Sequence, residues 1–284
     1  MSIECGICGK KEIKFLFKNE GNDYYRCSDC GLEKIYPPPP TSDIEYFYGE
    51  EYYRDSGCCQ EGEVRSIKVE TAKILLDMIP DSPNKRILDC GCAAGYFLEA
   101  AEERGFMAYG IEVSEAVAEI AQKKFLADRI YKGMFEDALF PKDFFYSVIM
   151  NGFLEHVREP ARILHKAREL LEPGGYLLIT TPDTGSFSYK IMRRWWPHYR
   201  PEHLFLFNKN NIKLLLGMFG FRLLDVRSSR ICVTLDYLRS KLAESHNRVM
   251  GLARKTIDLL PVNIRLKKGW FSLGQMSILA QKGI

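Results

Sequence analysis

The chain contains Ile87-Leu88-Asp89-Cys90-Gly91-Cys92-Ala93-Ala94-Gly95-Tyr96-Phe97, followed by Tyr109-Gly110-Ile111-Glu112. An apolar strand runs into a glycine-rich turn that opens a helix, and a second strand then ends on an acid. Gly91 and Gly95 allow a ligand to approach the backbone closely because they carry no Cβ. Glu112 stands where its carboxylate can accept hydrogen bonds from both hydroxyls of a ribose. The pattern therefore predicts a crevice for a nucleoside.

The spacing of this turn distinguishes between two kinds of ligand. It is Asp-x-Gly-x-x-x-Gly, whereas dinucleotide-binding enzymes carry Gly-x-Gly-x-x-Gly. Asp89 precedes the turn, and a carboxylate at this point favours a ligand with an ammonium group over one with a pyrophosphate.

Further pieces follow the turn at regular intervals. An apolar run that ends on a polar residue, Ser147–Asn151, is followed by Leu154-Glu155-His156-Val157. A predicted helix over 159–171 then leads to Glu172-Pro173-Gly174-Gly175 and a strand over 176–182. Together with the turn, these pieces resemble the class I S-adenosylmethionine (SAM) methyltransferases. The resemblance covers roughly the last two hundred residues, the size of one domain.

The resemblance implies an enzyme that transfers a methyl group from SAM, and it assigns roles around the crevice. Asp89 would face the methionine ammonium, and Glu112 would hold the ribose. The cofactor-binding residues that it implies are Asp89, Gly91, Cys92, Ala93, Gly95, Glu112, Val113, Met134, Phe135 and Asn151. Many relatives carry Asp where Met134 stands, so backbone groups or Glu136 would have to meet the adenine amino group here.

The order of the predicted elements defines the fold class. Strands are expected near 86–90, 107–112, 129–132, 146–151, 176–182, 221–228 and 274–282, with helices near 64–79, 95–104, 115–126, 159–171 and 208–218. Strands that alternate with helices predict an α/β fold with a largely parallel sheet. The resemblance makes this a Rossmann-like seven-stranded methyltransferase sheet with helices on both faces and a reversed last strand. Such sheets bind ligands beyond the carboxyl ends of their strands.

Four of the nine cysteines form Cys5-x-x-Cys8 and Cys27-x-x-Cys30, with eighteen residues between the two pairs. Each pair aims two thiolates at one point, so the two pairs predict a zinc ribbon. The metal, Zn²⁺ or iron in its place, is expected to be structural because four thiolates leave no open coordination position. The alternative is a pair of redox Cys-x-x-Cys motifs, but no thioredoxin-like βαβ pattern surrounds them. The other five are interpreted as reduced packing or turn residues: Cys58, Cys59, Cys90, Cys92 and Cys232.

Two domains are predicted. Residues 1–40 form the zinc ribbon and a spacer of four prolines, and residues 41–284 form the methyltransferase domain. In the second domain, residues 41–85 cover the core, and a tyrosine-rich stretch over 46–53 caps the cofactor or pins the linker to the core. Residues 231–272 are an insertion between the last two strands.

The insertion is expected to hold one amphipathic helix over residues 235–260. The interpretation favoured by its pattern is a helix packed on the domain beside the active site. The alternatives are a homodimer contact or a weak contact with a membrane surface.

Two loop histidines, His203 and His156, are the candidates for a catalytic base, because both follow strands whose ends face the substrate. His203 follows Trp195-Trp196 and Tyr199, whose rings could stack on a ring-shaped acceptor. The alternative is that both histidines only order their loops. Quinone-type O-methyltransferases carry a metal-binding Glu-x-x-Glu-His here, and Gly152 replaces the first glutamate, which argues against a catalytic metal.

Composition limits the location and the partners. The net charge is +3 with acids and bases interspersed, so the chain shows no footprint for a nucleic acid. No apolar run approaches the roughly 18 residues of a membrane helix. The first residues show no basic start and no apolar signal core. A cytoplasmic protein is the expectation.

The leading hypothesis is methyl transfer to a small-molecule or glycan-precursor acceptor, by resemblance to bacterial zinc-ribbon methyltransferases. An RNA methyltransferase is the first alternative, but the chain has Asn151-Gly152-Phe153-Leu154 where such enzymes carry an Asn-Pro-Pro-Tyr type of loop. A SAM-binding protein that uses its ribbon for protein interaction is the second. The intact set around Asp89 and Glu112 argues against a degenerate site.

Overall fold

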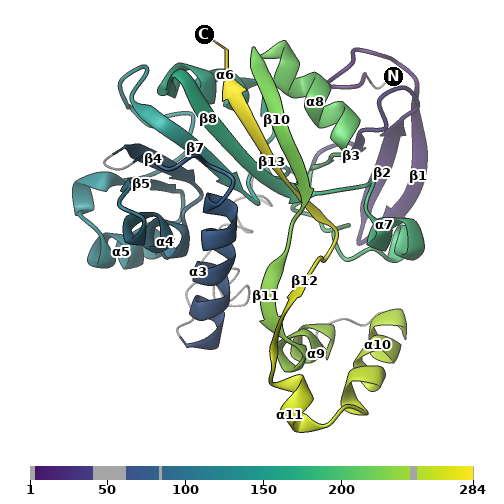
Figure 1. Ribbon diagram of the computed structural model, residues 1–284. Coiled ribbons are helices and arrows are strands. Elements are labelled where there is room, and N and C mark those ends of the chain that lie inside the picture. Colours follow the sequence, from purple (N-terminus) through teal and green to yellow (C-terminus); the bar gives the residue numbers. More distant parts are fainter. Residues whose placement is uncertain (1–3, 41–61, 83–84, 244–247, 284) are drawn as a thin grey trace.

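The computed structural model describes residues 4–40, 62–82, 85–243 and 248–283. Its centre is a seven-stranded sheet in the order β10-β13-β8-β7-β4-β5-β6 (Figure 1). Strands β4 to β8 are parallel to one another. Strand β13 is antiparallel to both of its neighbours, β8 and β10. The strands are β4 Arg86–Cys90, β5 Met107–Glu112, β6 Ile130–Lys132, β7 Phe145–Asn151, β8 Leu171–Pro182, β10 Phe221–Ser228 and β13 Gln275–Lys282.

Alternate residues of the central strands face opposite layers of helices, which is why these strands are apolar throughout. Ile87 and Leu178 lie in the core shared with α3, α4 and α5. Their neighbours Leu88 and Leu177 lie in the core shared with α6 and α8. The predicted seven-stranded sheet with helices on both faces and a reversed last strand is confirmed. The helices are α3 Glu63–Leu76, α4 Tyr96–Glu103, α5 Glu115–Lys124, α6 Pro160–Leu170, α7 Phe187–Met192 and α8 Lys209–Met218, and the short 3-10 turns are Ala127–Arg129 and Arg193–Trp195.

The cysteine-bearing segment forms a second sheet, and a strand from far along the chain completes it. Strands β1 (Ile13–Asn19), β2 (Asn22–Cys27) and β3 (Glu33–Ile35) pair antiparallel, and β9 (Phe205–Leu206) pairs with β3. In the spacer, Arg158 donates to the backbone carbonyl of Pro39. The ribbon and spacer are thus joined to the larger domain by the main-chain pairing of β3 with β9 and by this side-chain hydrogen bond. The domain boundary at residue 40 stays a prediction.

A buried carboxylate adds to this junction. Glu33 is fully buried, and its two oxygens accept hydrogen bonds from the hydroxyls of Tyr189 and Tyr199, each at 2.6 Å. Burial raises the pKa of Glu33, while the two tyrosine hydroxyls act to lower it. Tyr189 lies on α7 and Tyr199 on the loop that follows, so one ribbon side chain holds both segments.

The insertion over 231–272 differs from the single helix predicted for 235–260. It consists of a two-stranded stem, β11 (Ile231–Thr234) and β12 (Lys268–Phe271), and of three helices, α9 (Leu235–Ala243), α10 (Arg248–Asp258) and α11 (Val262–Arg265). The prediction of one helix was wrong because the apolar spacing runs through two separate helices, α9 and α10, which pack against each other. Within 62–82, 85–243 and 248–283, no helix has both the length and the apolar character needed to cross a bilayer.

Two other expectations need comment. Strand β8 begins at Leu171 rather than at residue 176, because Leu171 already pairs with Phe145 before the register shifts. The tyrosine-rich stretch over 46–53, together with Cys58 and Cys59, lies outside the described residues.

Candidate functional site

Hydrogen bonds to the neighbouring strand shape the glycine turn after β4. The amides of Gly91 and Cys92 both donate to the carbonyl of Ile111, at 2.8 and 2.9 Å. Gly91 and Gly95 have φ values of +76° and +84°, which favour glycine. Gly95 is also required by packing, since a Cβ there would lie 2.3 Å from the ring of Phe125. The turn is therefore set against the end of β5 before any ligand binds.

Glu112 ends β5 beneath this turn and is 1% exposed. Its Oε2 accepts from the amide of Ala93 at 3.0 Å, and its Oε1 accepts from the amide of Ser114 at 2.9 Å. These bonds fix the carboxylate between the glycine turn and the start of α5. A group that accepts from backbone amides still has lone pairs for ligand hydroxyls.

Asp89 is buried next to Glu112, and its Oδ1 has no hydrogen-bond partner. Burial raises the pKa of Asp89, and the nearby Glu112 charge raises it further. A buried acceptor without a partner is costly in a folded protein. The position calls for a cationic or donating group from a ligand.

The other residues predicted to contact the cofactor lie around the same edge of the sheet. Val113 and Met134 are 37% and 47% exposed, so both offer apolar surface to a base. Phe135 is buried and packs edge-on against Phe153, and Asn151 ends β7, where its Oδ1 accepts from Thr180 at 2.5 Å. Cys92 is buried beneath the turn, and burial raises its thiol pKa, so the thiol stays neutral. Because β4 lies between β5 and β7, and β6 lies beside β5, the structure brings this set to one edge of the sheet.

The two candidate bases meet each other. The rings of His156 and His203 lie edge to face, with centroids 4.8 Å apart. The Nδ1 of His203 is 2.8 Å from the carbonyl of His198, so Nδ1 carries the proton and Nε2 keeps its lone pair. Burial lowers the pKa of His156 to about 4 and lowers that of His203 well below its usual range. Both rings are neutral at pH 7.

Glu155 completes this cluster. Its Oε2 is buried and has no hydrogen-bond partner, and burial raises its pKa to about 7. Glu155, His156 and His203 each place one potential ligand atom within 4.8 Å of the others. The cluster therefore offers three potential metal ligands, although Gly152 stands where the quinone-type enzymes carry their first glutamate.

The aromatic residues before His203 have other partners than expected. Trp196 is buried, and its ring contacts the ring of His198 at 4.7 Å between centroids. Tyr199 is held by Glu33. Only Trp195 of this group is largely exposed, so the expected aromatic wall beside His203 is mostly internal packing.

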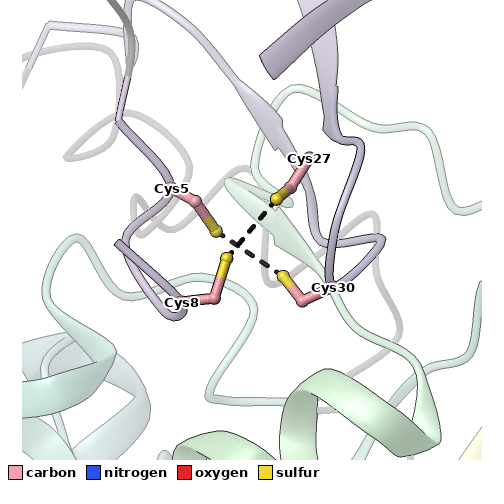
Figure 2. Close-up of side chains that lie close together, drawn as sticks. All are labelled: Cys5, Cys8, Cys27 and Cys30. Carbon is pink, nitrogen blue, oxygen red and sulfur yellow. Dashed lines mark hydrogen bonds between the residues drawn. The ribbon is translucent and has the colours of Figure 1, made fainter. Parts of the chain in front are cut away.

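The four ribbon cysteines point at a common centre (Figure 2). The Sγ atoms of Cys5 and Cys30 are 3.6 Å apart, and those of Cys8 and Cys27 are 3.5 Å apart. All four Sγ atoms lie within 4.8 Å of one another. A tetrahedron with sulfur atoms about 2.3 Å from a metal has edges of about 3.8 Å. The cluster therefore has the size of a four-thiolate metal site.

A polar cavity of 810 Å³ opens beyond the end of β8, and sequence reasoning missed it. Asp183, which directly follows β8, lies in its wall with Lys190 of α7 and Lys209 of α8. Arg26 reaches it from the ribbon. An acid directly after a buried strand is a sequence signal that could have identified Asp183. The three cations come from separate segments, and no sequence pattern indicates that they meet.

Comparison with known proteins agrees with this geometry. The family model for a methyltransferase domain matches residues 64–226. The chain belongs to this family, and it is a class I SAM-dependent methyltransferase. A SAM-dependent methyltransferase of Thermotoga maritima has the same fold, with a TM-score of 0.54 at 19% identity over 84% of this chain and 99% of that chain.

Curated relatives match part of the chain. It is 32% identical over 110 residues to the ubiquinone biosynthesis O-methyltransferase of Alkalilimnicola ehrlichii. The match covers 37% of this chain and 44% of that protein. It is 30% identical over 141 residues to the protein of that name in Aeromonas salmonicida, covering 46% and 59%. The chain spans about half the length of these relatives.

Proposed function

We propose that this methyltransferase methylates a hydroxyl group of a polar, anionic small molecule, such as a phosphate-bearing glycan precursor. The observation that carries the acceptor class is the cavity at the end of β8, whose side chains include three cations against one acid. Thr180 of β8 is paired with Asn151, and Asp183 lies three residues on, which is at most about 10 Å of extended chain. The cavity thus begins next to the cofactor crevice. The relatives named as O-methyltransferases support oxygen as the acceptor atom.

For the cofactor, we propose that Asp89 accepts from the SAM ammonium and Glu112 from the ribose hydroxyls. The backbone from Gly91 to Gly95 would line the methionine part, Val113 and Met134-Phe135 would enclose the base, and Asn151 would lie near the methionyl tail. SAM supplies a methyl group on a sulfonium, which is transferred by in-line displacement. The protein's main contribution is then to hold the acceptor in line, and such positioning can contribute about 7–11 kcal/mol.

For the proton, we propose that His203 accepts it from the acceptor hydroxyl, with His156 and Glu155 as its polar neighbours. The Nε2 of His203 has the required lone pair, because Nδ1 is bonded to the His198 carbonyl. The lowered pKa keeps the ring neutral at pH 7, so the lone pair of Nε2 is available to the hydroxyl.

For the ribbon, we propose one structural Zn²⁺, or iron in its place, held by Cys5, Cys8, Cys27 and Cys30. The four sulfur atoms have the spacing of a tetrahedral site. Such a metal leaves no open position for a substrate, so its effect is on folding.

The acceptor proposal is tested by a tritiated-methyl transfer screen against nucleotide sugars, uncharged small metabolites and RNA. We expect transfer to an anionic sugar. Replacing both Lys190 and Lys209 by Ala should raise the KM for that acceptor by about tenfold or more, because a charge-assisted hydrogen bond contributes about 1.5–3 kcal/mol. Lys213→Ala, an exposed lysine on the same helix α8, is the matched control. Transfer only to RNA or to uncharged metabolites would disprove the acceptor class.

The affinity for SAM should depend on pH through Asp89. Its raised pKa means that the free protein retains a proton on this carboxyl at pH values where an ordinary Asp is ionised. Binding of an ammonium favours the carboxylate, so we expect proton release on binding and weaker binding as pH falls. Calorimetry in buffers of different ionisation enthalpy measures both. Asp89→Asn should weaken binding and remove the proton release, and unchanged proton release in that variant would contradict the assignment.

The role of His203 is tested by turnover and its pH profile. A positioned base contributes about 10²–10⁴-fold, so His203→Ala should lower kcat by that order while SAM binding stays unchanged. Because the pKa of His203 lies well below 6.5, the wild-type kcat should not fall as pH decreases through 6.5. Asp183→Asn is the comparison, since Asp183 is the buried acid in the acceptor cavity. If that variant loses turnover and His203→Ala loses only thermal stability, Asp183 is the base.

Elemental analysis should find one zinc or iron per chain. Removal of the metal by a chelator should lower the melting temperature, because it frees β1 to β3 and, through β3, the short strand β9. The SAM affinity should change little, since the residues around Asp89 and Glu112 lie on other strands. Freshly purified protein without metal would refute the ribbon assignment, and loss of SAM binding on chelation would show that the crevice depends on the ribbon.

A further inference from the structure

Residues 231–243 and 248–272 form an arm that projects from the main sheet, with the β11–β12 stem at its root and α9 to α11 at its end (Figure 1). Two contacts tie the root to α3. Thr234 Oγ1 donates to Glu63 Oε1 at 3.0 Å, and Lys268 Nζ donates to Ser66 Oγ at 2.9 Å. The arm is thus anchored at its base while α11 lies at its far end.

The far end of the arm exposes apolar side chains over one short stretch. Leu259 is 84% exposed, and its neighbours before and within α11 are exposed as well. We call this set the arm tip: Leu259, Leu260, Val262, Ile264 and Leu266. The half-exposed Trp270 follows it on β12. A monomeric protein seldom exposes so many large apolar side chains in one short segment without a partner.

The charge of the arm points to the kind of partner. Residues 231–272 contain eight Lys and Arg against three Asp and Glu, which gives +5, whereas the whole chain carries +3. In the described part of the arm, both acids are already paired. Arg239 binds Asp258 at 2.5 Å, and Arg265 binds Asp236 at 3.2 Å. Lys255 and Lys267, which stand on either side of the arm tip in the sequence, are exposed.

The direction of the arm relates it to the active site. Strand β10 runs parallel to β8, because both are antiparallel to β13. The arm leaves at the carboxyl end of β10 and returns at Gln275, which pairs with Pro182 at the end of β8. The arm therefore leaves the sheet at the end where the crevice and the polar cavity open.

We propose that the arm tip docks on an anionic lipid surface, with the apolar side chains inserted among the headgroups and the lysines on the phosphates. An apolar segment flanked by lysines is the composition of interfacial membrane contacts. A second copy of the chain fits less well, because two arms of charge +5 repel each other. Docking would turn the crevice end of the sheet toward the membrane. The inference stands independently of the acceptor proposal.

Sedimentation of the full chain with vesicles tests the proposal. Vesicles of equal parts phosphatidylcholine and phosphatidylglycerol are compared with pure phosphatidylcholine. We expect binding to the anionic vesicles only, and weaker binding at high salt. Replacing Leu259 and Val262 by Asp should lower the partition coefficient by about tenfold or more, because it removes inserted apolar groups and adds charge. Replacing Lys255 and Lys267 by Glu should lower it as well.

Leu139→Asp is the matched control, since Leu139 is 92% exposed and lies outside the arm. It should bind vesicles as the wild type does. Unchanged melting temperature and SAM affinity in every variant show that the fold persists. Absence of wild-type binding to anionic vesicles overturns the proposal. So does a dimer in sedimentation velocity that dissociates when Leu259 and Val262 are replaced, because the arm tip would then be a contact between copies.

Discussion

The carbonyl of Ile111 accepts two backbone amides of the glycine turn, and the proposed cofactor site depends on this contact. It holds the turn after β4 against the end of β5, where the amide of Ala93 donates to Glu112 Oε2. The helix that follows can begin only because Gly95 adopts a left-handed conformation and leaves room for Phe125. Turn, acid and helix start are therefore placed by the folded backbone rather than by the ligand, and a preorganised site loses little freedom on binding.

The ribbon takes part in positioning the segment from α7 to β9, which carries His203. Its strand β3 pairs with β9, and Glu33 on that strand holds Tyr189 and Tyr199 through two short hydrogen bonds. The loop between α7 and β9 carries His203 and is thus supported from the ribbon. A metal that folds β1 to β3 would stiffen this loop at a distance from the reacting atoms. This gives a physical reason for a zinc ribbon in front of a methyltransferase, beyond recruitment of a partner.

The fold and the arrangement of the residues proposed to bind the cofactor follow from local sequence, while the contacts of Glu33 and the lining of the polar cavity do not. The turn from Asp89 to Gly95 and the acid Glu112 lie within one βαβ unit, so their spacing alone predicts their arrangement, and the pairs of ribbon cysteines are equally local. The contacts of Glu33 with residues more than 150 positions away leave no periodic trace in the sequence. The polar cavity likewise gathers Arg26, Lys190 and Lys209 from three separate elements. The prediction of a single helix in the insertion failed because apolar spacing does not show where one helix ends and the next begins.

Two buried acids in one crevice impose an electrostatic constraint that a cationic ligand relieves. Burial and the Glu112 charge both raise the pKa of Asp89, and Glu112 accepts two backbone amides whereas Asp89 Oδ1 has no partner. A proton on Asp89 avoids the repulsion between two buried carboxylates, and an ammonium from a ligand can replace that proton. The histidine pair shows the opposite adjustment, since burial lowers the pKa of His156 and His203 and keeps both rings neutral. Burial thus favours the uncharged form in both clusters: it raises the pKa of the acid Asp89 and lowers the pKa of the two histidines.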